Sequence, residues 1–374
     1  MRPHSILTLS TLLFVYASAL GGQSAGRGVW TQARARAWGD SVGWVVGSNF
    51  IPSTAINQLE MWQAETFDPA TINRELSWAE SLGFNSARVF LHHLLWQQDS
   101  TGFLRRMDEF LAIADRHHIR PIFVLFDAVW DPLPHLGTQR APVPHLHNSG
   151  WVQSPGAAML GDTTRLDELR GYVQGVVGRF ANDRRVLAWD VFNEADNVNR
   201  PAYIAYEPLE KQRNAFVLLR RAFAWARAMG PSQPLTAAPW KGDWVRRADM
   251  LPITAYMLDS SDVISFHSYS DSATVARQVA ALQRYGRPII CSEYMARPLG
   301  STFRKVLPLL KSRRIAAFNW GFVSGKSQTI YPWDSWGREY TAEPKVWFHD
   351  IFRRDGSPFD STEVRFIRRT VLGR

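Results

Sequence analysis

Residues 187–197 read LAWDVFNEADN and combine two contrasting halves. The first half begins with leucine, alanine, tryptophan and valine, as a buried strand does. The second half is a polar cluster that contains Asn193, Glu194, Asp196 and Asn197. The stretch therefore predicts a strand that runs out of the core and presents an amide and a carboxylate at its carboxyl end.

Similar β-type runs recur along the chain and alternate with helical patterns. The strand candidates are residues 43–50, 86–91, 121–126, 187–192, 235–240, 263–268, 288–293 and 316–321. Several are apolar on both faces, as in a parallel sheet covered by helices. Apolar residues at three- and four-residue spacing predict helices over stretches such as 71–83, 102–118, 165–180 and 273–286. Eight strand–helix units predict a single α/β domain, an eight-stranded (β/α)8 TIM barrel.

The amino terminus resembles a secretion signal. Arg2 precedes an apolar stretch over 6–20, and residues 17–19 read ASA, a small-residue cleavage pattern. The stretch is too short to span a bilayer comfortably, and no later segment is long and apolar enough to do so. We expect residues 1–25 to be a signal peptide and 26–374 the barrel domain of a secreted or periplasmic protein without stable membrane insertion. A retained membrane anchor is the alternative.

Composition restricts the partners. The net charge is +9, but the basic residues are mostly arginine and form no basic run, so we expect no nucleic-acid partner. The 16 tryptophans are more informative, since they serve either a large core or stacking surfaces for sugar rings. The single cysteine, Cys291, excludes an intramolecular disulfide. We expect a monomer.

Two connections are too long to be simple links, namely 127–164 and 323–344. Both leave the carboxyl end of a strand, the face on which barrels of this kind hold their active sites. Their tryptophans are expected to form walls of a cleft and to stack on sugar rings: Trp130, Trp151, Trp333 and Trp336. No glycine-rich phosphate loop follows a strand, and His145 and His147 have no placed carboxylate or cysteine beside them. We therefore expect no cofactor and no metal.

A second polar cluster ends the seventh strand candidate at Glu293. Because three strand–helix units separate Glu194 from Glu293, we expect the two carboxylates to face one another across the barrel mouth. Paired carboxylates at a cleft are what cleavage of a glycosidic bond needs. One must be protonated and the other ionised, which requires environments that push their pKa values apart.

Other strand ends offer side chains for that tuning. Arg88 is expected to hold one carboxylate in its charged form. His267 and Tyr269 are placed to hydrogen-bond the carboxylates, and Trp320 to form a floor for a sugar ring. Asn193 is expected to donate to a sugar hydroxyl next to the reacting carbon.

These residues resemble the clan A retaining glycoside hydrolases, in particular the cellulase-like glycoside hydrolase family 5, over essentially the whole mature chain. The resemblance implies that Glu194, after Asn193, is the acid/base and that Glu293 is the nucleophile. It also implies substrate-site roles for other matching residues: Arg88, His267, Tyr269 and Trp320. The expected reaction is hydrolysis of an oligosaccharide or polysaccharide with retention of configuration.

One position departs from the family pattern. Members usually present a histidine at the end of the third strand, where this chain reads Leu125-Phe126-Asp127. We expect Asp127 to lie among the substrate-binding residues, with His92 and His93 as candidates to replace the missing histidine.

Two other classes of protein compete with this interpretation. A metal-dependent barrel hydrolase needs His-x-His at the end of the first strand, and residues 43–50, GWVVGSNF, contain no histidine. A secreted carbohydrate-binding barrel that has lost catalysis stays open, although both glutamates argue against it. The sugar, its linkage and exo or endo action also stay open at this point.

Overall fold

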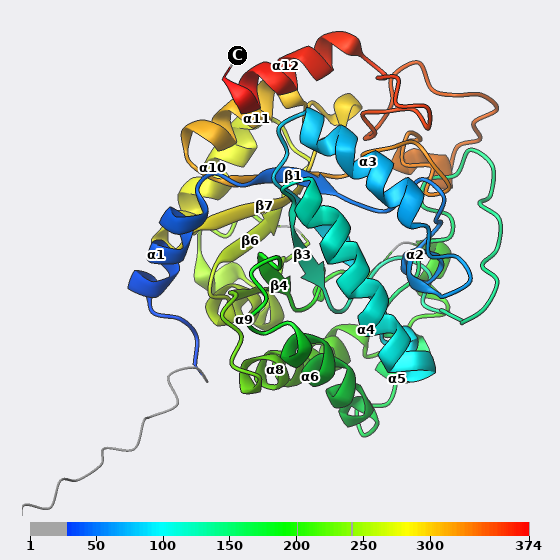
Figure 1. Ribbon diagram of the computed structural model, residues 1–374. Coiled ribbons are helices and arrows are strands. Elements are labelled where there is room, and N and C mark those ends of the chain that lie inside the picture. Colours follow the sequence, from blue (N-terminus) through cyan, green and yellow to red (C-terminus); the bar gives the residue numbers. More distant parts are fainter. Residues whose placement is uncertain (1–27, 200, 241, 374) are drawn as a thin grey trace, which may run out of the picture.

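Eight parallel strands form the centre of the molecule (Figure 1), and they confirm the (β/α)8 TIM barrel predicted from the sequence. The computed structural model describes residues 28–199, 201–240 and 242–373. The sheet order is β5-β4-β3-β2-β1-β8-β7-β6. The strands are β1 (Val46–Asn49), β2 (Ser86–Phe90), β3 (Arg120–Val124), β4 (Ala188–Asp190), β5 (Leu235–Thr236), β6 (Ile264–His267), β7 (Ile289–Tyr294) and β8 (Ala316–Asn319).

Each strand lies within or next to its predicted run, and most are shorter than predicted. The difference is mostly at the carboxyl ends, where the chain leaves the ladder and turns into the loops of the barrel mouth, whereas β1 also begins three residues later than predicted. The expected signal segment, 1–25, lies outside the described residues. No helix in the described ranges has the length and apolar character needed to cross a membrane.

Helices surround the strands (Figure 1). The α-helices are α1 (Gln32–Val42), α2 (Gln58–Trp62), α3 (Pro69–Ser81), α4 (His93–Arg116), α5 (Ala157–Leu160), α6 (Arg170–Arg179), α7 (Pro201–Ile204), α8 (Lys211–Ala228), α9 (Pro252–Ser260), α10 (Ser272–Leu282), α11 (Phe303–Ser312) and α12 (Ser361–Leu372). Short 3₁₀ turns are η1 (Leu166–Leu169), η2 (Arg247–Asp249), η3 (Gln283–Tyr285), η4 (Arg297–Leu299) and η5 (Trp333–Trp336).

Side-chain caps explain where several helices begin. Asp68 accepts from the Thr71 amide at 3.0 Å and Pro69 occupies the first turn of α3, where its missing N–H costs nothing. Asp271 caps α10 in the same way. Helix α4 is kinked at Asp99, whose carboxylate accepts from the Gly102 amide at 2.8 Å. The predicted helix over 102–118 corresponds to the part of α4 that follows this kink.

The inside of the barrel changes character along its axis. Its amino-terminal half is filled by apolar side chains such as Ile122, Ile290 and Phe318. Toward the carboxyl ends, the buried side chains become polar, with Asn49, Arg88 and others at most 5% exposed. A polar layer therefore lies above the apolar core at the carboxyl end of the strands, which is the end where a (β/α)8 enzyme has its active site.

The sheet order ends at β5 on one side and at β6 on the other, so these two strands meet at a seam. Near the seam the Asp262 amide donates to the Leu235 carbonyl at 2.7 Å. The Thr236 hydroxyl donates to the Val263 carbonyl at 2.8 Å and lies 2.6 Å from the Ser265 hydroxyl. Side chains thus supply part of the closure that a backbone ladder supplies elsewhere.

Candidate active site

Two glutamates meet in the polar layer at the barrel mouth. Glu194 follows β4 and has a positive φ of 50°, and Glu293 lies in β7 where the register with β8 shifts between Cys291 and Tyr294. Each glutamate is 4% exposed. One carboxylate oxygen from each lies within 4.8 Å of the other, so the structure brings this predicted pair together.

Arg88 is the centre of the hydrogen-bond network below the pair. It is completely buried, and its guanidinium uses all of its donor directions. Nη1 donates to Glu293 Oε1 at 2.8 Å, and Nη2 donates to the Asn193 side-chain oxygen at 2.7 Å. The planar fork thus ties the nucleophile candidate to the residue that precedes Glu194.

Two members of this network were not found in the sequence analysis. Asp190 accepts from Arg88 Nε at 3.0 Å and from Nη2 at 2.7 Å, and Asn49 accepts from Nη1 at 2.9 Å. A charged residue inside the apolar run 187–192 was the available signal for Asp190, because a buried carboxylate in a strand requires a partner. Asn49 gave no comparable signal.

Glu293 is held on both of its oxygens. Oε1 pairs with Arg88, and Oε2 accepts from the Tyr269 hydroxyl at 2.6 Å. Burial raises the pKa of the Glu293 carboxyl above its ordinary value, while the Arg88 charge and the Tyr269 hydrogen bond act against that rise. The direct cationic partner therefore favours the ionised form of this carboxylate.

Glu194 has a different environment. Burial raises the pKa of its carboxyl to about 8, and the Asn197 side chain, which donates to Oε2 at 2.8 Å, opposes the rise. Oε1 lies 2.7 Å from His267 Nδ1. Burial also lowers the pKa of His267 to about 4, so the ring is neutral at pH 7 and does not act as a cation toward Glu194. The protonated form of Glu194 is therefore favoured at neutral pH.

The expected substrate contact of Asp127 needs correction. Its carboxylate is 1% exposed and does not line the cavity at the mouth. It accepts from Trp151 Nε1 at 2.7 Å and from Asn193 Nδ2 at 2.9 Å, and burial raises its pKa to about 8. Asp127 thus fixes the Asn193 side chain from below, while Asn193 itself lines the cavity.

His92 and His93 also lie away from the cavity. Their rings stack with centroids 4.8 Å apart, and both are buried. His92 Nε2 is 2.8 Å from the Gln153 carbonyl, and His93 Nδ1 is 3.1 Å from the Ser154 hydroxyl. Neither side chain replaces the missing third-strand histidine, because both hold the loop 127–164 against the barrel.

A cavity of about 230 Å³ opens above the two glutamates. Trp130, Trp320 and Trp333 line it as predicted from the sequence, together with Tyr269. Trp240 also lines it and was missed, although it ends the fifth predicted strand run. The cavity combines aromatic surfaces with the carboxylate pair, as expected of a site for a polar ring with apolar faces.

Trp151 does not offer the stacking surface that was expected. It is only 2% exposed and packs edge-on against Trp320 at a centroid distance of 5.4 Å and against Phe90 at 5.1 Å. It supports Trp320 from behind. Trp336 stacks on Trp130 with centroids 6.1 Å apart and an interplanar angle of 5°, so it supports the cavity wall.

Only one group in the described ranges brings three possible metal ligands together, and it consists of Glu194, His267 and Glu293. The oxygens of both carboxylates already have protein partners. Arg88 and Tyr269 occupy the two oxygens of Glu293, and the guanidinium 2.8 Å away would repel a cation. The geometry therefore suits two carboxylates in different protonation states better than a metal centre.

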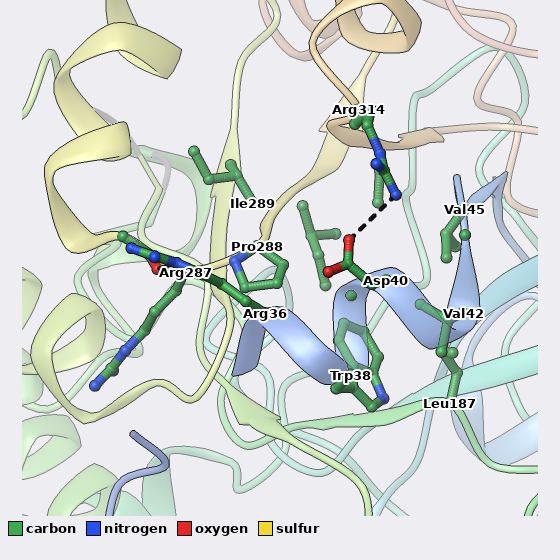
Figure 2. A pocket seen from close by; sticks show the side chains of 15 residues that line it. Arg36, Trp38, Asp40, Val42, Val45, Leu187, Arg287, Pro288, Ile289 and Arg314 are labelled. Atoms are coloured by element: carbon green, nitrogen blue, oxygen red, sulfur yellow. Dashed lines mark hydrogen bonds and ion pairs between the residues drawn. The ribbon is translucent and has the colours of Figure 1, made fainter. Parts of the chain in front are cut away.

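Another hollow, of about 330 Å³, lies at the amino-terminal end of the barrel beneath α1 (Figure 2). Trp38 and the starts of β7 and β8 line it, and Asp40 pairs with Arg314 at 3.4 Å. This end of a (β/α)8 barrel serves stability, and the hollow contains no pair of facing carboxylates.

No protein-family model and no curated protein sequence matches the chain. Solved structures do. A GH5_18 variant from Streptomyces cattleya, in complex with Manβ1-4GlcNAc, is 14% identical with a TM-score of 0.57 over 88% of this chain and 80% of that one. An exo-β-1,4-mannosidase from Opitutaceae bacterium strain TAV5 is 17% identical with a TM-score of 0.58, and the match spans 88% of this chain and 60% of the mannosidase.

A third structure is matched over nearly its whole length. It is a GH5 xyloglucan-specific endo-β-1,4-glucanase from a metagenomic library, in complex with cellotriose, at 12% identity and a TM-score of 0.55. The match covers 90% of this chain and 99% of the glucanase. The chain is therefore structurally similar to glycoside hydrolases of family 5, and at sequence identities of 12–17% this similarity shows the shared barrel fold alone.

Proposed function

We propose that the protein is a retaining β-glycosidase in which Glu293 is the nucleophile and Glu194 the acid/base. The observation that carries this proposal is the carboxylate pair, with oxygens within 4.8 Å and unequal environments. Retaining enzymes place the two carboxyl groups about 5–5.5 Å apart, whereas inverting enzymes leave roughly 6.5–9.5 Å for a water. The short approach of Glu194 and Glu293 supports double displacement.

The first step forms a bond between the Glu293 carboxylate and the anomeric carbon. The glycosidic C–O bond breaks, and the Glu194 proton passes to the leaving oxygen. In the second step a water attacks the same carbon, gives its proton to Glu194 and releases Glu293. The raised pKa of Glu194, about 8, suits a group that must carry a proton at neutral pH, and Arg88 suits a partner that must be ionised.

Several contacts support the substrate class. Trp320 offers an aromatic floor, and Asn193 is fixed between Arg88 and Asp127 so that its amide lines the cavity. The structural neighbours named above are a β-mannosidase, an endo-β-1,4-glucanase and a GH5_18 variant with bound disaccharide. We propose a β-linked oligosaccharide or polysaccharide as substrate and, from the character of residues 1–25, action outside the cytoplasm.

A panel of 4-nitrophenyl β-glycosides of glucose, mannose, galactose and xylose tests the proposal. Wild type should release 4-nitrophenol from at least one, and NMR should show the β-anomer as first product. Glu293→Ala should lose nearly all activity, and azide should restore part of it with an α-glycosyl azide as product. Binding of oligosaccharides without turnover of any glycoside would instead identify a carbohydrate-binding barrel.

A further inference from the structure

We infer that the cavity accepts a single terminal sugar ring and that the enzyme removes monosaccharides from the non-reducing ends of its substrates. The inference rests on the proposed function and adds the mode of action, which the sequence left open. It depends on which side of the carboxylate pair is closed and which side continues.

The side beyond Trp320 is filled. Trp320, Trp151 and Phe90 form a packed aromatic group, with centroid distances between 5.1 and 5.7 Å. The space left among Trp151, Trp320 and Asn148 is about 20 Å³. That volume holds about one water molecule. A second sugar ring therefore has no place behind the ring that would lie on Trp320.

The wall on this side is made by two loops that are joined to each other. The Asn148 amide donates to the Ser327 carbonyl at 2.9 Å, and Trp336 Nε1 donates to the His147 carbonyl at 2.9 Å. The Trp130–Trp336 stack adds an apolar joint between the same loops. Because backbone groups take part in the joint, the loops 127–164 and 323–344 form one continuous barrier.

The opposite side continues into another hollow. Asn197, Asn199 and Trp240 line both the catalytic cavity and a neighbouring hollow of about 370 Å³. Asn197 also donates to the Glu194 carboxyl, so this junction lies on the side of the proposed acid. The acid protonates the departing group, and therefore the departing group belongs in the second hollow.

These two observations fix a direction. In a β-glycosidase the ring attacked by the nucleophile is the glycone. Any further sugars attached to the non-reducing end of the glycone need space next to that end. The packed aromatic side chains leave no such space at the non-reducing end, whereas the hollow on the leaving-group side has room for further sugar residues. An internal bond of a long chain therefore cannot reach Glu293, whereas the terminal bond can.

The test uses oligosaccharides that report the site of cleavage. The sugar is taken from the aryl glycoside that the enzyme hydrolyses, and its β-1,3- and β-1,4-linked hexaoses are labelled at the reducing end with 2-aminobenzamide. Early time points should contain unlabelled monosaccharide and labelled pentaose. Early labelled disaccharide, trisaccharide or tetraose would overturn the inference, and so would cleavage of the aryl glycoside with no cleavage of any hexaose.

A cap on the non-reducing end gives an independent readout. A 4,6-O-benzylidene group on a cleaved hexopyranose hexaose, or a 4-O-methyl group on a xylohexaose, should reduce cleavage at least 100-fold. Cleavage of the capped hexaose at the uncapped rate would show that the site is open at the non-reducing end. A failure of the proposed function looks different, because no aryl glycoside would then be hydrolysed by wild type.

Discussion

Replacing Glu194 by alanine separates the roles of the two carboxylates. With a pKa of about 8, the Glu194 carboxyl is about tenfold more often protonated than ionised at pH 7, and about tenfold more often ionised at pH 9. Activity that needs its proton should therefore fall along a basic limb centred near pH 8. General acid catalysis contributes typically 10²–10⁴-fold, or about 2.7–5.4 kcal/mol of transition-state stabilisation.

The assay measures kcat/KM between pH 5 and 10 for two aryl glycosides of the same sugar. The phenyl glycoside has a poor leaving group and needs the proton, whereas the 2,4-dinitrophenyl glycoside does not. Glu194→Ala should lose about 10²–10⁴-fold on the phenyl glycoside and retain measurable turnover on the activated one. Its basic limb near pH 8 should disappear on the phenyl glycoside, the substrate that needs the proton.

Two results would refute this reasoning. An equal loss on both glycosides would mean that Glu194 does not protonate the leaving group, and Glu293→Ala sparing only the activated substrate would mean that the roles are reversed. Glu65→Ala is the matched control, because Glu65 is an exposed glutamate away from the cavity. It should keep wild-type rates on both substrates.

Three further predictions concern other residues. Arg88→Ala should move the acidic limb of kcat/KM to higher pH, because the lost guanidinium had held down the pKa of Glu293, and an unchanged acidic limb would contradict the pairing. The same variant should lower the free energy of unfolding by about 3–5 kcal/mol, because it leaves Asp190 buried without its cationic partner. Trp240→Ala should raise KM for an oligosaccharide by roughly fivefold, which corresponds to about 1 kcal/mol of aromatic contact, and an equal rise for a methyl glycoside would argue against a leaving-group contact. Burial raises the pKa of Glu75 to about 7 from its ordinary 4.5, so its contribution to stability is present below pH 4.5 and is lost as the pH rises through 7. In urea unfolding, the stability of Glu75→Gln relative to wild type should therefore increase by about 3 kcal/mol between pH 4.5 and 7, and a constant difference would refute the shift.

The barrel and the carboxylate pair were predictable because both follow from local sequence. Short apolar runs identify strands, and a polar residue directly after such a run lies at the barrel mouth whatever the loops do. That reasoning found Glu194, Glu293 and Arg88. It also predicted contacts of Tyr269 and Arg88 with the carboxylates, which the structure contains.

The positions that failed depend on packing between distant segments. Asp127 directly follows the third predicted strand, and Trp151 lies further along the loop that begins there. Both are buried because the loop 127–164 folds back on the barrel. Its partners are residues such as Ser327 and Trp336, which are far away in the sequence. Periodicity carries no information about such contacts, so the loop could be recognised as a cavity wall without showing which of its side chains face inward.

The seam between β5 and β6 is the place where we expect the barrel to open locally most readily. Most other strand neighbours share a longer backbone ladder, whereas Thr236 closes the seam partly through its hydroxyl. The strand that leads to Glu194 lies on one side, and the strand of Glu293 on the other. A transient opening there would break the contact between His267, at the end of β6, and the Glu194 carboxyl, which follows β4. Loss of turnover on warming should therefore precede global unfolding, with amide hydrogens next to the seam exchanging first.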